Sequence, residues 1–122
     1  MSFASSVLEN LNSLDRSSAD SSDFGIVEVD DAGVIKLYNK YESDLASIAP
    51  DAAEGKNFFT QVAPCTNNRL FYGRFQEGVK GNDLNAEMDY VFTYKMRPTR
   101  VKIHMYRDPR EGRNFVFVKK NA

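Results

Sequence analysis

The chain has one cysteine, Cys65, one histidine, His104, and no tryptophan among its 122 residues. A single cysteine excludes an internal disulfide, and with a single histidine it supplies too few soft ligands for a tetrahedral zinc site. We therefore expect no metal site. With 42% hydrophobic residues, a chain of this length can bury one core unaided. The sequence thus predicts a single domain that folds without metal or disulfide.

The sequence also lacks long runs of one charge and long apolar segments. It has 16 basic and 17 acidic residues and a formal net charge of −1, which makes nucleic acid and anionic membranes poor partners. The longest apolar run covers only residues 115–118, and the first basic residue is Arg16. We therefore expect no membrane span and no signal peptide, and a cytoplasmic location.

Hydrophobic patterning divides the chain into an N-terminal cap, residues 1–23, and a core, residues 24–122. The cap carries apolar residues at helical spacing and is expected to be a weakly held flap. Residues 24–29 and 34–38 predict a β-hairpin whose turn requires a positive φ at Gly33. Alternating apolar residues predict three more strands around residues 88–94, 101–105 and 116–118. The apolar positions of the cap are Phe3, Val7, Leu11 and Leu14.

The middle of the chain has helical signals. Asn39 is a predicted N-cap with Glu42 at the capping-box position, and irregular short helices are expected over residues 50–64. The longest helix is predicted over residues 69–80, with an apolar stripe and a left-handed stop at Gly81. The order of elements predicts an α+β fold, an antiparallel five-stranded sheet with helices gathered on one side. The stripe consists of Leu70, Phe71, Phe75 and Val79.

Two sets of residues are candidates for chemistry. Cys65 is either a small buried hydrophobe or a nucleophile. A thiol enzyme is disfavoured because His104 alternates with apolar positions and is expected to face the polar side of its strand. For Tyr38 and Glu42, spacing alone favours an exposed tyrosine and a capping-box glutamate. The alternative is that their hydroxyl and carboxyl groups converge on one buried acceptor.

Seven short stretches between Phe24 and Val118 form a combined motif. They are Phe24-Gly25, Leu37-Tyr38-Asn39 with Glu42, Gly55-Lys56-Asn57-Phe58-Phe59, Val62-Ala63-Pro64-Cys65-Thr66, Phe71-Tyr72-Gly73, Tyr94-Lys95-Met96-Arg97-Pro98-Thr99 and His104-Met105. In this order the chain resembles the photoactive yellow proteins, small blue-light receptors with a PAS fold. The third and fourth stretches are specific in combination, because a generic PAS domain is not expected to contain them.

The resemblance implies a photoreceptor rather than an enzyme. It implies that p-coumaric acid (4-hydroxycinnamic acid) is joined to Cys65 through a thioester, trans and ionised in the dark. Tyr38, and Glu42 while protonated, would donate hydrogen bonds to the phenolate oxygen, and the backbone N–H of Cys65 would donate to the thioester carbonyl. Met96 would assist the return to trans. The remaining pocket residues implied are Ala46, Ile48, Phe58, Val62, Ala63 and Phe92, with Met96 beside them.

The resemblance also implies how a signal arises. Light isomerises the chromophore, the phenolate takes the proton of Glu42, and the buried carboxylate drives partial unfolding in which the cap detaches. An unidentified downstream signalling protein would read this change, and the chain is expected to be monomeric in the dark. Two positions depart from the family pattern: Ala46 replaces a threonine and Ile48 an arginine. The alternative function is a PAS-like module that binds another small ligand non-covalently.

Overall fold

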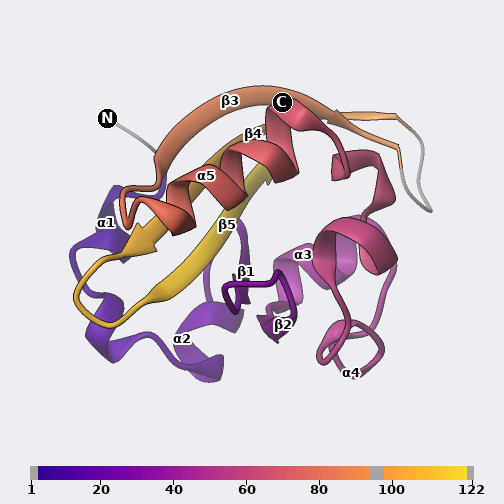
Figure 1. Ribbon diagram of the computed structural model, residues 1–122. Coiled ribbons are helices and arrows are strands. Elements are labelled where there is room, and N and C mark those ends of the chain that lie inside the picture. Colours follow the sequence, from indigo (N-terminus) through magenta and orange to yellow (C-terminus); the bar gives the residue numbers. More distant parts are fainter. Residues whose placement is uncertain (1–2, 94–97, 121–122) are drawn as a thin grey trace.

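The structure, a computed structural model, describes residues 3–93 and 98–120. At its centre lies a five-stranded antiparallel sheet with the strand order β2-β1-β5-β4-β3 (Figure 1). The predicted α+β fold and its sheet are therefore confirmed. Tyr94, at the end of one predicted strand, lies outside the described residues. The strands are β1 (Gly25–Val29), β2 (Ile35–Tyr38), β3 (Asn85–Phe92), β4 (Thr99–Asp108) and β5 (Arg113–Lys120).

Short helical segments surround the sheet. Among the described residues, three precede β1 and six lie between β2 and β3. Irregular short helices were predicted over residues 50–64, and α4, η2 and the start of η3 lie there. The first group is α1 (Ser5–Leu8), η1 (Leu11–Ser13) and α2 (Arg16–Asp20). The second group is α3 (Lys40–Ala46), α4 (Pro50–Ala53), η2 (Phe58–Val62), η3 (Pro64–Thr66), η4 (Arg69–Gly73) and α5 (Arg74–Lys80).

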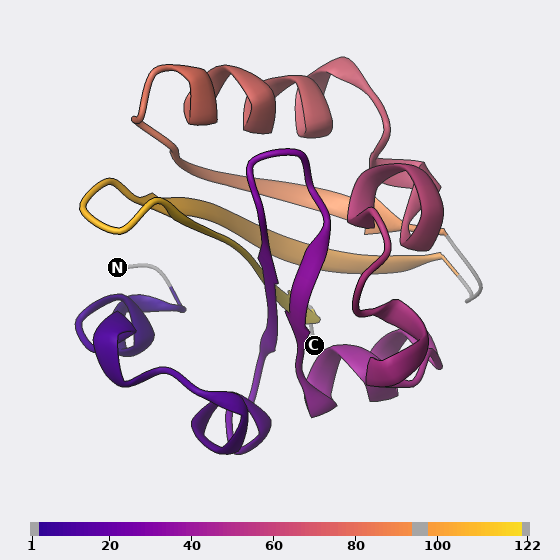
Figure 2. The same ribbon diagram turned by 60° about the horizontal axis from the view of Figure 1, so that its bottom comes forward.

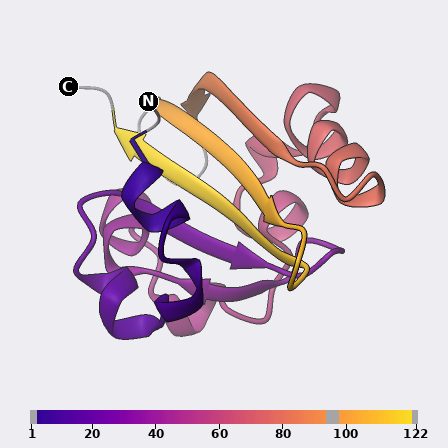
Figure 3. The ribbon, with the colours of Figure 1, turned by 90° about the vertical axis from the view of Figure 1, so that its left-hand side faces the viewer.

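The two helical groups cover opposite faces of the sheet (Figures 2 and 3). Along β5, Val116 and Val118 enter one apolar cluster, beneath the second helical group, whereas Phe115 and Phe117 enter another, beneath the cap. The expectation that the helices gather on one side is therefore wrong. The reason is that the central strand is apolar on both faces, and each face needs a cover.

Two details of the predicted helix over residues 69–80 are also wrong. Its first turn, η4, is a π-helix, in which the N–H of Gly73 bonds to the carbonyl of Asn68 at 3.0 Å. In this wider turn Leu70 does not share the buried face of Phe71 and is 76% exposed. At the other end Gly81 is right-handed, with φ −87°.

The left-handed residue after α5 is Asn82, with φ 52°. The N–H of Asn82 bonds to the carbonyl of Val79, and the N–H of Asp83 bonds to that of Gly78. This is the Schellman pattern, in which asparagine can take the place that glycine usually fills. The helix therefore ends at Lys80, as predicted, but the left-handed residue that follows it is Asn82 and not Gly81.

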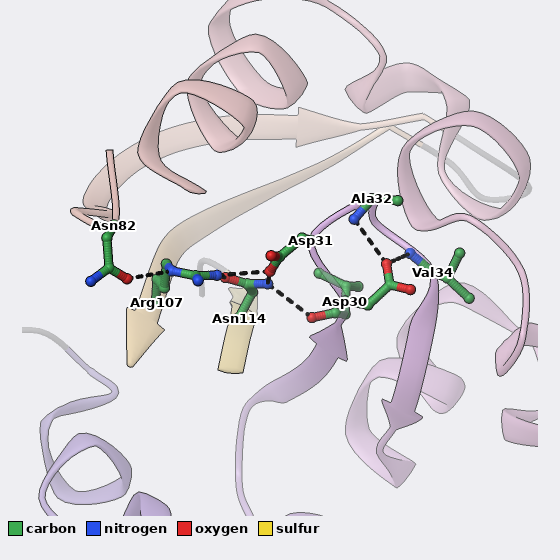
Figure 4. Close-up of polar contacts among 8 residues, drawn as sticks. Asp30, Asp31, Ala32, Val34, Asn82, Arg107 and Asn114 are labelled. Carbon is green, nitrogen blue, oxygen red and sulfur yellow. Dashed lines mark hydrogen bonds and ion pairs between the residues drawn. The ribbon is translucent and has the colours of Figure 1, made fainter. Parts of the chain in front are cut away.

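The turn between β1 and β2 is held by hydrogen bonds within it and by an ion pair to β4. Gly33 has φ 99°, as predicted, and Asp30 Oδ1 accepts hydrogen bonds from the N–H groups of Ala32 and Val34, both at 2.9 Å. Within the turn, Asp31 forms an ion pair with Arg107 at 2.8 Å (Figure 4). Arg107 also donates to Asn82 and Asn114, both at 2.8 Å, so it joins β4 to β5, to this turn and to the end of α5.

Candidate functional site

Tyr38 and Glu42 are both completely buried, with 0% of either residue exposed. Tyr38 ends β2, and Glu42 lies in the first turn of α3. The interpretation favoured by spacing, an exposed tyrosine and a capping-box glutamate, is therefore wrong. Asn39 does cap α3 by accepting from the N–H of Glu42 at 3.1 Å, but its own N–H donates to Ile26.

Asn39 connects the segments that surround Glu42. Its Oδ1 accepts from the N–H of Ile26 at 2.9 Å as well as from that of Glu42. Its Nδ2 donates to the carbonyls of Ala19 at 2.7 Å and Phe24 at 3.0 Å. One buried amide thus satisfies backbone groups of the cap, of β1 and of α3, which fixes the start of the helix that carries Glu42.

A glycine makes room for the Glu42 carboxyl group. A Cβ atom at Gly25 would lie 2.5 Å from Glu42 Oε1 and 3.2 Å from the Val118 side chain. Any larger residue at this place in β1 would have to displace the carboxyl group or the strand. The pair Phe24-Gly25, which belonged to the sequence motif, therefore has a packing reason.

Cys65 lies in η3 and is partly buried against the apolar cluster beneath the second helical group. Its carbonyl accepts from the Tyr90 hydroxyl at 2.5 Å and from Asn68 Nδ2 at 3.2 Å. Asn68 Nδ2 also lies 2.6 Å from the Tyr90 hydroxyl. The backbone N–H of Cys65 bonds to no residue within 3–93 or 98–120. The backbone of Cys65 is therefore held by its carbonyl and keeps a donor available.

The other expected pocket residues, where described, meet in this same cluster. Tyr38 belongs to it, and Ile48 and Cys65 pack against it. Met96 lies outside the described residues. An apolar wall therefore adjoins both the thiol and the buried tyrosine, although the two come from different parts of the chain. The buried members of the expected pocket are Ala46, Phe58, Val62, Ala63 and Phe92.

His104 does not face a polar surface, as the sequence suggested, but is 3% exposed. It pairs with Phe117 across β4 and β5, and their rings lie 6.2 Å apart. Its Nε2 lies 2.6 Å from Asn85 Oδ1, and its Nδ1 lies 3.8 Å from Glu87. His104 and Cys65 thus pack on opposite faces of the sheet, which excludes a dyad between them in this fold.

The buried histidine makes stability depend on pH. Burial lowers the pKa of His104 from its ordinary value of 6.5, with Glu87 opposing the effect. The unfolded chain therefore binds this proton at higher pH than the folded chain, and the stabilisation is lost as the pH falls below 6.5. We expect the free energy of unfolding of the chromophore-free chain to decrease between about pH 7.5 and about pH 5.5.

Urea unfolding of the wild type and of His104→Gln at both pH values tests this prediction. Since the chain has one histidine, the wild-type change should exceed that of the variant. Equal changes in the two proteins would contradict it.

Comparison with known proteins identifies the family. No protein-family model matches the chain. A photoactive yellow protein of Rhodothalassium salexigens is 46% identical over 97 residues, which cover 80% of this chain and 78% of the relative. The solved photoactive yellow protein domain of the sensor histidine kinase Ppr from Rhodospirillum centenum is 40% identical. It superposes with a TM-score of 0.85 over 92% of this chain and 98% of that one. The chain belongs to the photoactive yellow protein family.

The PAS fold of the photoactive yellow protein family extends to distant structures. A PAS domain from Colwellia psychrerythraea shares 12% identity with this chain and superposes with a TM-score of 0.70, over 94% of this chain and 97% of that one. This likeness concerns the fold alone. Membership of the photoactive yellow protein family supports a sensory, light-receiving role for the chain rather than an enzymatic one.

Some contacts at the site could not be read from the sequence. Tyr90 showed only as one apolar position in an alternating strand, and its hydroxyl contact with the Cys65 carbonyl is tertiary. The sequence marked Asn39 as the N-cap of a helix, but it gave no sign of its bonds to the N-terminal cap and to β1.

Where the chain is described, no three acidic, histidine or cysteine side chains are grouped to bind a metal. No helix in the described ranges has the length and hydropathy of a membrane span.

Proposed function

We propose that this chain is a blue-light photoreceptor in which p-coumaric acid is joined to Cys65 through a thioester. The observation that carries the proposal is one apolar cluster that contains buried Tyr38 and receives Cys65. The carboxyl group of Glu42, also buried, lies beside Gly25. A phenolate placed in such a cluster needs donors, since burial disfavours the charged form. Tyr38 and Glu42 are donors of the required kind, and a bond from either to an anion is stronger than a neutral one.

The backbone around Cys65 fits a thioester. Because Pro64 precedes it, the first N–H in η3 belongs to Cys65, and this group donates to no described residue. A thioester carbonyl is an acceptor that would use it. Tyr90 and Asn68 hold the carbonyl of Cys65 and so restrain the backbone of η3 that carries this N–H.

When bound, the p-coumaroyl group supplies a phenolate that absorbs blue light and a double bond that isomerises. Before illumination Glu42 holds a proton on its carboxyl group and donates it in a hydrogen bond. After illumination Glu42 would give up this proton to the phenolate oxygen, which would become a neutral phenol, and Glu42 would become a buried carboxylate. An unpaired buried charge costs roughly 3–5 kcal/mol, which is comparable with the roughly 5–15 kcal/mol that stabilises a domain. Partial unfolding relieves this cost by admitting water.

The cap is the segment that we expect to detach. The cap meets the core through the apolar cluster that contains Phe115 and Phe117. It also makes a few polar contacts, among them the bonds of Asn39 to Ala19 and of Lys40 to Asp20. Asn39 also binds the N–H of Glu42, so the charged residue and the cap share a partner. We propose that a downstream signalling protein reads the exposed surface.

Ala46 and Ile48 mark how this site departs from the family pattern. Ala46 ends α3 and is completely buried, and Ile48 packs against the apolar cluster. Neither side chain can donate a hydrogen bond or carry a positive charge. We propose that the pigment forms nevertheless, stabilised by the neutral donors Tyr38 and Glu42.

Reconstitution tests the proposed function. The purified chain is treated with activated p-coumarate, and its mass and visible spectrum are recorded. We expect one added coumaroyl group that thioester cleavage removes, and a blue-absorbing band that bleaches in light, recovers in darkness and is lost in acid. An unmodified thiol after this treatment would contradict the proposal. Reversible binding of a ligand to the unmodified chain would then favour the non-covalent PAS-like module.

A further inference from the structure

One carboxylate oxygen joins the buried tyrosine to the cap. Glu54 follows α4 as its C-cap residue, and its Oε2 accepts a hydrogen bond from the backbone N–H of Tyr38 at 3.0 Å. The same oxygen is bound by Arg16 Nη2, from the first residue of α2. Glu54 thus contacts β2 on one side and the cap on the other.

The Tyr38 N–H needs this acceptor because β2 is an edge strand. At the start of β2 the backbone of the following segment supplies the missing partners: Ile35 donates to Lys56, and Gly55 donates to Ile35, both at 2.8 Å. At the end of β2 the acceptor is a side chain, the carboxylate of Glu54. A buried N–H without an acceptor would be costly, so the carboxylate fixes the strand end that carries the phenol.

We propose that Glu54 is a positioning residue for Tyr38, and that Arg16 links this positioning to the docked cap. The proposal rests on the proposed function, in which the Tyr38 hydroxyl donates to the chromophore. In this chain Ala46 offers no side-chain hydrogen bond to orient the phenol, so support through the backbone matters more. The contact joins α2, β2 and the residue after α4, which are separated in the sequence and meet only in the folded chain.

The link works in both directions. While the cap is docked, Arg16 holds the Glu54 carboxylate against the end of β2. When the cap leaves, Glu54 loses its cation, and the bond to Tyr38 loosens. By reciprocity, weakening the bond to Tyr38 makes cap release easier. Arg16 is 48% exposed and Glu54 24%, so the ion pair itself contributes less than the bond to the buried N–H.

Four variants separate these roles. Glu54→Ala removes both contacts, Glu54→Gln keeps an acceptor for Tyr38 but removes the charge, and Arg16→Gln removes only the cation. Asp44→Asn is the matched control, because Asp44 forms an exposed ion pair with Lys40 on α3. The backbone amide exchange of Tyr38 and Ala19 is measured by NMR in the chromophore-free chain. The pH at which half of the blue band is lost is measured in the pigment.

We expect Glu54→Ala to speed exchange of the Tyr38 amide about 10- to 100-fold. Glu54→Gln should have a smaller effect, and Arg16→Gln should speed exchange in the cap at Ala19 by about 5-fold or less. In the pigment, Glu54→Ala should raise the midpoint of acid bleaching, because a less well oriented phenol stabilises the phenolate less. A purely structural residue would lower thermal stability without moving this midpoint.

Two results would overturn the inference. The first is Tyr38 amide exchange in Glu54→Ala and Glu54→Gln that equals exchange in Asp44→Asn. The second is an acid-bleaching midpoint in both Glu54 variants that equals that of the wild type. Failure of the photoreceptor proposal is a separate result, in which the wild type takes up no chromophore. Amide exchange in the chromophore-free chain still decides in that case whether Glu54 holds Tyr38.

Discussion

Changing Cys65 to alanine is expected to give a folded protein that never acquires the blue-absorbing band. Cys65 is the only cysteine, so the variant has no sulfur from which a thioester can form. The fold should survive, since Cys65 is only partly buried and its backbone carbonyl keeps its bonds to Tyr90 and Asn68. We expect a loss of about 1 kcal/mol or less in the free energy of unfolding.

Mass spectrometry and the visible spectrum after treatment with activated p-coumarate measure this effect. Wild-type protein whose thiol has been alkylated beforehand is the matched control, because it keeps the native chain and blocks only the sulfur. Both samples should remain colourless and gain no coumaroyl mass. A coumaroyl group retained on the alanine variant would place the attachment elsewhere and refute the role of Cys65.

Changing Glu42 to glutamine is expected to leave the pigment but to suppress the light-induced unfolding. Glutamine keeps a hydrogen-bond donor and nearly the same volume in the space beside Gly25. It has no proton to give up, so no carboxylate forms in the buried site. A penalty of roughly 3–5 kcal/mol is thereby absent. We expect the fraction of molecules with a detached cap under light to fall about 10-fold or more.

Hydrogen exchange of the cap, compared in darkness and under continuous illumination, measures this fraction. Glu87→Gln is the matched control. It makes the same chemical change at a side chain on the sheet that is 59% exposed. The control should unfold under light as the wild type does. If Glu42→Gln exposed the cap to the same extent, a buried charge would not be the cause of unfolding.

The strand pattern and the turn at Gly33 were predictable because they depend on neighbours in sequence. Apolar residues at alternate positions along residues 101–105 and 116–118 indicate strands, and the positive φ at Gly33 follows from turn geometry alone. The errors have tertiary causes. Leu70 is exposed because its turn is a π-helix, and His104 is buried because the cap covers the face that it shares with Phe117. Neither cause can be recognised from the residues next to Leu70 or His104 in the sequence.

For the site, too, the sequence predicted some features and missed others. The motif around Cys65, with Tyr38 and Glu42, led to the family from the sequence, and the family is confirmed. Their assigned roles stay predictions, and Met96 lies outside the described residues. Apart from the helix cap at Asn39, the supporting contacts had no sequence signal. Gly25, Asn39 and Glu54 act on residues that are 16 or more positions away or on another element, so spacing alone does not pair them.

By itself the sequence predicted the α+β fold, which the structure confirms, and it showed a single thiol and too few soft ligands for a zinc site. Composition and local periodicity suffice for that, because they depend on residue counts and on nearest neighbours. Only the tertiary structure decided that Tyr38 and Glu42 are buried, and that Glu54 binds both the strand end and the cap. Burial and long-range hydrogen bonds arise when distant segments pack together, and the spacing of residues along the chain does not record which segments these are.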